Sequence, residues 1–139
     1  MTTIRYLFDT CLILYLASGE ALAPSAGKAL EESSDRTDSL FISAFSAWEI
    51  GMLVSKGRLS LTQPPLPWFR SFAAERELSV LDATPDILVA ASFLPEPLHG
   101  DPADRILVAT AREHDLTIIT RDRAVLAYGA AGHVKVLAC

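Results

Sequence analysis

Short apolar runs alternate with longer amphipathic segments along most of the chain. Runs rich in strand-forming residues occupy positions 4–8, 40–42, 78–81, 116–120 and 134–137. Apolar residues at helical spacing between them predict helices at 11–18, 24–36, 47–56, 68–77, 87–93, 102–114 and 122–128. Pro64, Pro65 and Pro67 indicate a loop before the fourth helix, and 94–100 indicates another loop.

This alternation of strands and helices predicts an α/β fold. Parallel strands joined by helical crossovers form a sheet with helices on both faces, so we expect a three-layer α/β/α sandwich. Its central sheet should be mostly parallel and have four or five strands. The whole chain, 1–139, should be a single domain. Ligands of such folds bind at the carboxyl ends of the strands, where functional residues should therefore be sought.

Composition and charge restrict the partners of the chain. Half of the residues are hydrophobic and 21% are charged, which is typical of a globular protein. A net charge of −5 argues against broad binding to a polyanion, so any RNA should bind locally, and a basic protein is an alternative partner. The absence of a long apolar run and of a signal-peptide pattern leads us to expect a cytoplasmic protein.

Acidic residues gather where the predicted strands end or the next helices begin. Asp9 directly follows the first strand and Asp122 follows the fourth, while Glu49 and Asp104 stand near helix starts. All four should reach the same edge of the sheet. Each acid alone has a simpler interpretation, because acidic residues cap helices. Asp9 could be only an N-cap, and the segments starting at Ser46 and Asp101 resemble capping boxes.

Several carboxylates at one edge repel one another unless a cation neutralises them. Oxygen ligands without a His or Cys cluster favour Mg²⁺ or Mn²⁺ over Zn²⁺. Such ions activate water and stabilise the charge on a phosphoryl group, so phosphodiester hydrolysis is the reaction that this arrangement favours.

Four segments carry a resemblance to a known family, and together they span nearly the whole chain. They are YLFDT at 6–10, ISAFSAWEI at 42–50, HGDPADRILVATA at 99–111 and LTIITRD at 116–122. In this order and spacing they resemble the successive motifs of PIN-domain ribonucleases, and especially those of VapC-type toxins of bacterial toxin–antitoxin pairs. The resemblance implies an endoribonuclease that acts on RNA and requires Mg²⁺ or Mn²⁺, with Asp9, Glu49, Asp104 and Asp122 as catalytic metal ligands. It also implies a homodimer and a cognate antitoxin.

Neighbouring residues add to this picture and depart from it at one position. The hydroxyls of Thr10 and Thr120 are candidates for supporting the carboxylates, and we interpret Asp101 chiefly as the cap of its helix. Cys11 stands where many relatives carry Asn or His, and Cys cannot make the same hydrogen bonds. We expect Cys11 and Cys139 to be buried as small apolar residues.

The remaining candidate residues have plain structural alternatives. Arg105, Arg121 and Arg123 could contact RNA phosphates or orient carboxylates, although surface ion pairing is the simpler role. The histidines at 99, 114 and 133 lack metal-binding spacing and are expected at the surface or in packing. Trp48 and Trp68 fall on helix faces that should point inward, so core packing is favoured over base stacking.

Competing functions are separated by particular residues. A receiver-type signalling module needs an acidic pair after the first strand and a lysine after the last, but Asp9 has no acidic neighbour and Lys135 lies within the final strand. A haloacid-dehalogenase-like phosphatase needs an acid at position 11. A housekeeping RNA-processing nuclease and a non-catalytic binding module remain open. For an antitoxin, we expect a basic segment to enter the acidic edge, with apolar contacts on the helices between residues 12 and 30.

Overall fold

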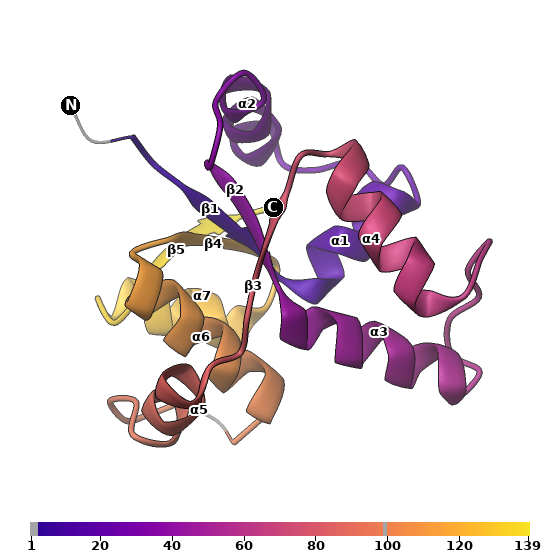
Figure 1. The fold of residues 1–139 in the computed structure, drawn as a ribbon. Coiled ribbons are helices and arrows are strands. Elements are labelled where there is room, and N and C mark those ends of the chain that lie inside the picture. The colour runs from indigo at the N-terminus through magenta and orange to yellow at the C-terminus, as the bar shows by residue number, and fades with distance from the viewer. Residues whose placement is uncertain (1–2, 99) are drawn as a thin grey trace.

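A computed structural model describes residues 3–98 and 100–139, and its centre is a five-stranded, fully parallel sheet (Figure 1). The strands are β1 Tyr6–Phe8, β2 Leu40–Ser43, β3 Ser79–Leu81, β4 Thr117–Thr120 and β5 Lys135–Ala138. They lie in the order β3-β2-β1-β4-β5, so the first strand of the chain is the middle strand of the sheet. Leu7 pairs with Phe41 on one side and with Ile118 on the other. The predicted parallel sheet of four or five strands is confirmed, with five strands that are all parallel.

Seven helices cover the sheet within the described residues. They are α1 Thr10–Ala17, α2 Pro24–Ser33, α3 Ala44–Ser55, α4 Pro65–Glu75, α5 Pro85–Ser92, α6 Pro102–His114 and α7 Arg123–Ala130. Each matches a predicted helix, with boundaries that differ by a few residues. No helix in the described ranges is long and apolar enough to cross a membrane.

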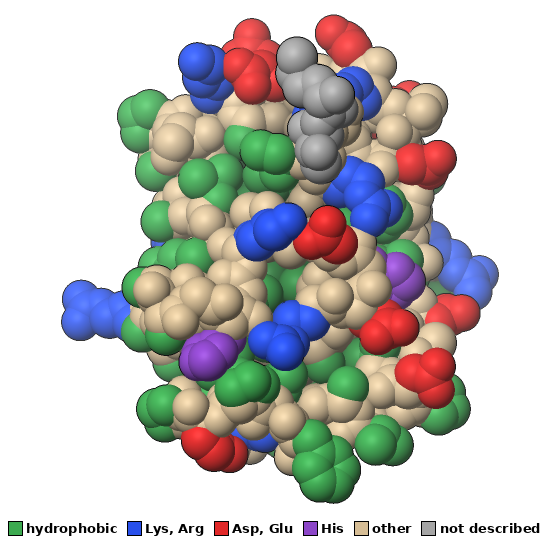
Figure 2. All heavy atoms as spheres, turned by 90° about the vertical axis from the view of Figure 1, so that its left-hand side faces the viewer, with side chains coloured by type: hydrophobic (Ala, Val, Ile, Leu, Met, Phe, Trp, Pro, Cys, Tyr) green, Lys and Arg blue, Asp and Glu red, His purple; other side chains and the backbone are tan. Residues whose placement is uncertain are grey.

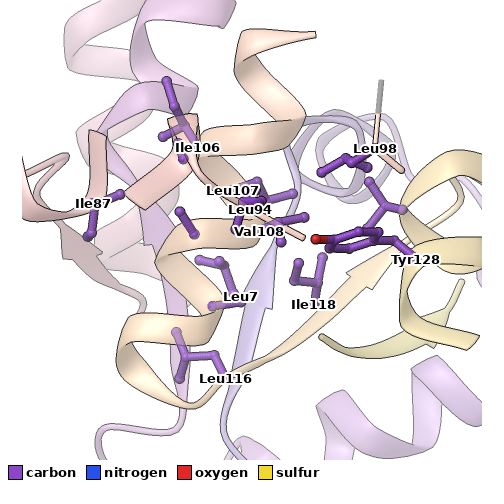
Figure 3. Packing of buried hydrophobic residues seen from close by; sticks show 14 of the residues in the cluster. Leu7, Ile87, Leu94, Leu98, Ile106, Leu107, Val108, Leu116, Ile118 and Tyr128 are labelled. Atoms are coloured by element: carbon purple, nitrogen blue, oxygen red, sulfur yellow. The ribbon is translucent and has the colours of Figure 1, made fainter. Parts of the chain in front are cut away.

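Successive residues of the central strands point into two different apolar clusters, because side chains alternate between the two faces of a strand. Leu7 and Ile118 are fully buried in one cluster with residues of α5, α6 and α7 (Figure 3). Phe8 and Ile119 belong to the other cluster, with residues of α1, α2, α3 and α4. The sheet therefore separates two outer layers of helices, and the predicted three-layer α/β/α sandwich is confirmed.

Two predicted helix starts are wrong. Pro65 and Pro67 lie inside the first turn of α4, where a helix needs no amide hydrogen from them, instead of in a loop. The N-cap of α3 is Ser43, whose hydroxyl accepts a hydrogen bond from the amide of Phe45 at 3.0 Å, so Ser46 is a helical residue and not the cap. Glu49 therefore stands on the second turn of α3 and does not complete a capping box.

Three of the connections bring polar residues to the carboxyl ends of the strands. α1 begins two residues after β1, α3 begins directly after β2, and α7 begins three residues after β4. Because β1, β2 and β4 are neighbours in the sheet, the starts of these helices lie at one edge. That edge is where the candidate site is built.

Candidate active site

Asp9 is held rigidly between the middle strand and the first helix. It follows β1 and is buried, with 7% of its surface exposed. Its Oδ1 accepts a hydrogen bond from the amide of Leu12 at 2.6 Å, which makes Asp9 the N-cap of α1. Its Oδ2 accepts a second hydrogen bond from the buried hydroxyl of Thr120 at 2.5 Å. The cap interpretation is therefore right, and the same carboxylate also faces the neighbouring strand end.

Glu49 reaches the same edge from α3 and is oriented by a residue of α1. The hydroxyl of Thr10 donates a hydrogen bond to Glu49 Oε1 at 2.5 Å, and its oxygen lies 2.9 Å from Ser46 Oγ. Ser46 is almost completely buried one turn before Glu49. Two neighbouring helices thus fix the side chain of Glu49 through hydroxyl groups.

The two remaining acids come from the opposite helical layer. Asp122 caps α7, accepting a hydrogen bond from the amide of Val125 at 2.9 Å, and its own amide donates to Thr120 Oγ1 at 3.0 Å. Asp104 lies in the first turn of α6, and Asp101 caps that helix by accepting from the amide of Ala103 at 3.0 Å. Thr120 therefore links two of the four candidate acids, Asp9 and Asp122.

The four acids predicted from the sequence line one small cavity of about 60 Å³. Its lining consists of Asp9, Thr10, Cys11, Ser43, Phe45, Ser46, Glu49, Ala103, Asp104, Leu107 and Asp122. Asp101 is not among them. The structure thus brings together Asp9, Glu49, Asp104 and Asp122 from four separate parts of the chain.

Burial and mutual repulsion both act on the acids of this cavity. Burial is the main reason that the pKa of Asp9 is raised, and the charge of Asp122 raises it further, while the hydrogen bond from Thr120 acts in the opposite direction. Burial likewise raises the pKa of Glu49, with smaller contributions from Asp101 and Asp9. Such a cavity favours a cation, because a positive charge offsets the cost of keeping the carboxylates ionised.

The donor set fits a hard divalent cation, although the side chains are not arranged as a closed cage. Within residues 3–98 and 100–139, no group of three or more Asp, Glu, His or Cys side chains is placed to hold an ion directly. The carboxylates line an open cavity and are held by hydroxyl and amide donors. This arrangement suits Mg²⁺, which keeps several waters and takes only one or two carboxylates as direct ligands.

Cys11 lies in the carboxylate cavity, so the prediction that it is buried is wrong. It is exposed, whereas Cys139 is buried as predicted. Its thiol is nevertheless partly shielded from water, and this desolvation, followed by the charges of all four acids, Asp9 first, raises the pKa of Cys11 to about 11. The thiol of Cys11 is therefore neutral at physiological pH and adds no negative charge to the cavity.

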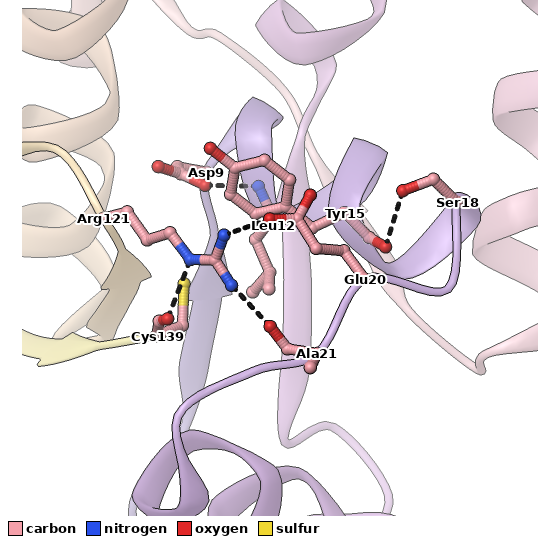
Figure 4. A network of polar contacts seen from close by, with 8 residues as sticks. All are labelled: Asp9, Leu12, Tyr15, Ser18, Glu20, Ala21, Arg121 and Cys139. Carbon is pink, nitrogen blue, oxygen red and sulfur yellow. Dashed lines mark hydrogen bonds and ion pairs between the residues drawn. The ribbon is translucent and has the colours of Figure 1, made fainter.

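Two of the three candidate arginines are engaged in holding the fold. Arg121 donates to the backbone carbonyls of Cys139 and Ala21 and to Glu20 Oε1, and its guanidinium lies 4.2 Å from the ring centroid of Tyr15 (Figure 4). These contacts connect the end of β4 to the segment between α1 and α2. The expectation of ion pairing is confirmed for Arg121, whose contacts are internal to the protein.

Arg105 has a comparable structural role, and Arg123 does not. Arg105 donates to the carbonyls of Ala91 and Leu98 and so fixes the segment between α5 and α6. Arg123 is exposed at the first residue of α7, next to Asp122. Arg123 thus lies at the start of the helix that Asp122 caps.

The aromatic and histidine predictions have mixed outcomes. Trp68 is half-buried and its ring stacks on that of Phe72 with centroids 5.5 Å apart, but Trp48 is 59% exposed, so the prediction that Trp48 points inward is wrong. His133 contacts the ring of Tyr128 and supports packing as expected. The prediction for His99 lies outside the described residues.

Ser43, Ser46 and Phe45 belong to the cavity lining but were not identified from the sequence. Their spacing could have identified the two serines, since Ser43, Ser46 and Glu49 are spaced three apart, as residues on one side of a helix and its N-cap are. The wrong cap for α3 hid this relation, because it placed Ser46 before the helix.

Comparison with known proteins agrees with this geometry. The model of the PIN domain family matches residues 6–130. The chain is 33% identical to ribonuclease VapC22 of Mycobacterium tuberculosis over 124 residues, which are 88% of this chain and 89% of that protein. The chain therefore belongs to the PIN domain family.

Solved structures give the same fold. A toxin–antitoxin complex from Klebsiella pneumoniae contains a chain that is 25% identical, with a TM-score of 0.62 and 96% of both chains covered. VapBC2 from Rickettsia felis, bound to a DNA fragment from its promoter, matches with a TM-score of 0.71 at 16% identity, covering 97% of this chain and 98% of that one. At that lower identity the match supports the fold alone.

Proposed function

We propose that the chain is an endoribonuclease that depends on a divalent metal and acts as the toxin of a toxin–antitoxin pair. The observation that carries the proposal is the single cavity lined by Asp9, Glu49, Asp104 and Asp122 at the carboxyl ends of the strands. It is supported by the 33% identity, over most of its length, to a protein named as a ribonuclease.

In this proposal the four acids would hold Mg²⁺ or Mn²⁺. An ion of this kind supplies activated water and neutralises charge on a phosphoryl group. The chain's own contribution is to place and support the carboxylates. Thr120 donates to Asp9 and Thr10 donates to Glu49, so both acids keep fixed orientations toward the cavity. Arg123, exposed beside Asp122, is placed to contact a phosphate of the RNA.

The test is cleavage of mixed cellular RNA by the purified protein with Mg²⁺, with Mn²⁺ and with EDTA. We expect cleavage with either ion, none with EDTA, and a loss of activity in Asp9→Asn, which keeps the hydrogen-bond acceptor for the amide of Leu12. Asp35→Asn, a matched change at an exposed site, should cut like the parent protein. Equal cutting by parent and Asp9→Asn, cutting in EDTA, or no cutting at all would each contradict the proposal.

An antitoxin would be recognised by a surface that combines apolar and acidic residues. A cavity of about 300 Å³ between α1, α2 and α4 is lined by Leu16, Leu30 and Leu40, and its charged lining residues are Glu75, Arg76 and Glu77, so that acids outnumber bases. A segment with apolar residues next to basic ones would fit it, in line with the apolar contacts expected between residues 12 and 30. Leu30→Glu should abolish rescue of cell growth by the small protein encoded next to the toxin and leave RNA cleavage intact.

A homodimer would have a suitable contact surface on α5. Two exposed apolar residues lie within this helix, Leu88 (42% exposed) and Val89 (61%). Phe93, the C-cap residue that follows the helix, is 82% exposed. Exposed apolar residues grouped on one short helix favour a protein interface. Light scattering of the purified chain should give the mass of a dimer, and Val89→Glu should reduce it to that of a monomer.

A further inference from the structure

An exposed tryptophan stands beside the carboxylate cavity on α3. Trp48 exposes 59% of its surface although large aromatic side chains are usually well covered. Its ring contacts that of Phe45, one turn earlier, with centroids 5.2 Å apart and an angle of 33° between the planes. The exposed ring of Trp48 thus rests on a ring that packs on its other side against the apolar core.

This aromatic pair is continuous with the candidate site. Phe45 is half-buried and is part of the cavity lining, together with Ser46 and Glu49. Trp48 directly precedes Glu49, and successive residues of a helix are about 100° apart around its axis. Trp48 is not itself in the lining, and it adjoins the cavity through its contact with Phe45, which is.

The net charge of the chain favours a non-ionic contact for a nucleic acid at this site. The chain has 12 basic and 17 acidic residues, so attraction of phosphates by many cations does not supply the affinity. Arg121, next to the site acid Asp122, donates to two backbone carbonyls and to Glu20. Stacking of a base on an aromatic ring needs no positive charge and is little affected by salt.

We infer that Trp48, supported by Phe45, is the stacking surface for an unpaired nucleobase of the RNA, next to the phosphate that enters the carboxylate cavity. This inference rests on the proposed nuclease function. A base within a duplex is already stacked on both faces, whereas an unpaired base can turn out and lie on the indole. Every base has a π-face, so the contact selects for single-stranded RNA and not for one base.

The first test measures contact, using the fact that the chain has only two tryptophans. Trp68→Phe leaves Trp48 as the fluorophore, and Trp48→Phe leaves Trp68, so the two variants are matched. Both carry Asp9→Asn, so that RNA is bound but not cut, and both are titrated with an unpaired oligoribonucleotide. Fluorescence should be quenched in the protein that keeps Trp48, and unchanged in the one that keeps Trp68. The same sequence placed in a hairpin stem should quench much less.

The second test measures the contribution to substrate binding with the parent active site. Trp48→Ala should raise KM for single-stranded RNA roughly 10-fold and leave kcat nearly unchanged, because a stacked base contributes equally to ground state and transition state. Trp48→Phe should recover most of the loss. The effect should persist at high salt. Leu66→Ala removes an apolar side chain on α4 that is 55% exposed but outside the cavity lining, and should leave KM unchanged.

Failure of this inference can be told from failure of the proposed function. Metal-dependent cleavage that is lost in Asp9→Asn, together with an unchanged KM in Trp48→Ala, would overturn the stacking role and leave the nuclease intact. Absence of such cleavage would overturn the function. Equal quenching by unpaired and paired RNA would also count against the inference. A change of oligomeric state in Trp48→Ala without quenching by RNA would overturn it and assign Trp48 to contact with a second copy of the chain.

Discussion

The two ends of the parallel sheet carry their charged residues in opposite ways. At the carboxyl ends a cavity of about 60 Å³ is lined by four acids and no basic residue. At the amino ends of β1, β4 and β5, a much wider cavity of about 1070 Å³ is lined by residues of both signs. Figure 2 shows the side of the molecule to the left in Figure 1, where basic and acidic side chains are spread over the surface without forming one patch.

The charges at the amino ends are already satisfied within the protein. Arg5 donates to the carbonyl of His114, and Arg112 donates to the carbonyl of His133. Lys135 forms an ion pair with Asp115 at 2.8 Å. The size of a cavity therefore does not identify the functional site of this protein. The small cavity is the one in which charges of one sign gather, one buried and three partly buried, and such places are candidates for chemistry.

The largest expected difference between the two ends is in catalysis. Glu49→Gln should lower RNA cleavage on the order of 100-fold or more, because it removes a charge from the cavity while keeping the acceptor for Thr10. Lys135→Ala, at the other end, should leave cleavage unchanged. Initial rates of both variants on one RNA substrate check this, and similar losses in both would contradict the distinction.

Glu49→Gln should also differ from the parent protein in thermal stability. Burial raises the pKa of Glu49, so the folded state holds this proton more tightly than the unfolded state does. The stability that this provides is present at low pH and is lost as pH rises from the ordinary value through the raised pKa. In EDTA at pH 7, Glu49→Gln should therefore unfold at a higher temperature than the parent, and the difference should disappear in acid. A lower unfolding temperature for Glu49→Gln than for the parent at pH 7 would contradict this prediction.

The acids of the cavity should also make Cys11 less reactive than an ordinary thiol, which is a smaller effect. With a pKa of about 11 against an ordinary value of 9.0, its thiolate fraction at pH 8 is about 100-fold below that of an ordinary thiol. Iodoacetamide should modify Cys11 correspondingly slowly in a Cys139→Ser background. Asp9→Asn should speed the reaction only in part, because burial is the larger cause. Modification at the rate of a free thiol would contradict the assignment.

Packing at the amino end should be sensitive to a single methyl group. A Cβ at Gly129 on α7 would lie 2.3 Å from Val136 Cγ2 on β5, so helix and strand must move apart. Gly129→Ala should destabilise the protein by about 1–3 kcal/mol in spite of the better helix propensity of alanine. Gly51→Ala on α3, where nothing lies within 4 Å, is the matched control and should stabilise slightly. Denaturant unfolding of both measures the contrast.

The smallest effect should come from the ion pair at the amino end. The side chains of Lys135 and Asp115 are 65% and 73% exposed, and water and salt screen exposed pairs of this kind. Lys135→Ala should therefore leave the free energy of unfolding almost unchanged, and the difference from the parent should be still smaller at high salt. A larger loss in denaturant unfolding would show that the pair matters more than its exposure indicates.

The sequence predicts the strands and the meeting of the four acids at one cavity, because both depend on local patterns. Apolar runs such as 116–120 end at a polar residue, and parallel strands bring all such ends to one edge. The direction of Trp48 was not predictable in this way, because it depends on which face of α3 the rest of the fold covers. Cys11 was predicted from its residue type, whereas its exposure follows from its place at the cavity.

The position of the cavity between the two helical layers has a consequence for local unfolding. Asp9 and Glu49 are held on the side of α1 and α3, whose residues Ile13 and Ile50 pack in one apolar cluster, whereas Asp104 and Asp122 stand on α6 and α7, which pack in the other. A ligand that engages acids of both layers binds only when both are in place. Its binding free energy would then oppose the opening of either layer, so amide exchange should slow in both α1 and α6 when the ligand binds.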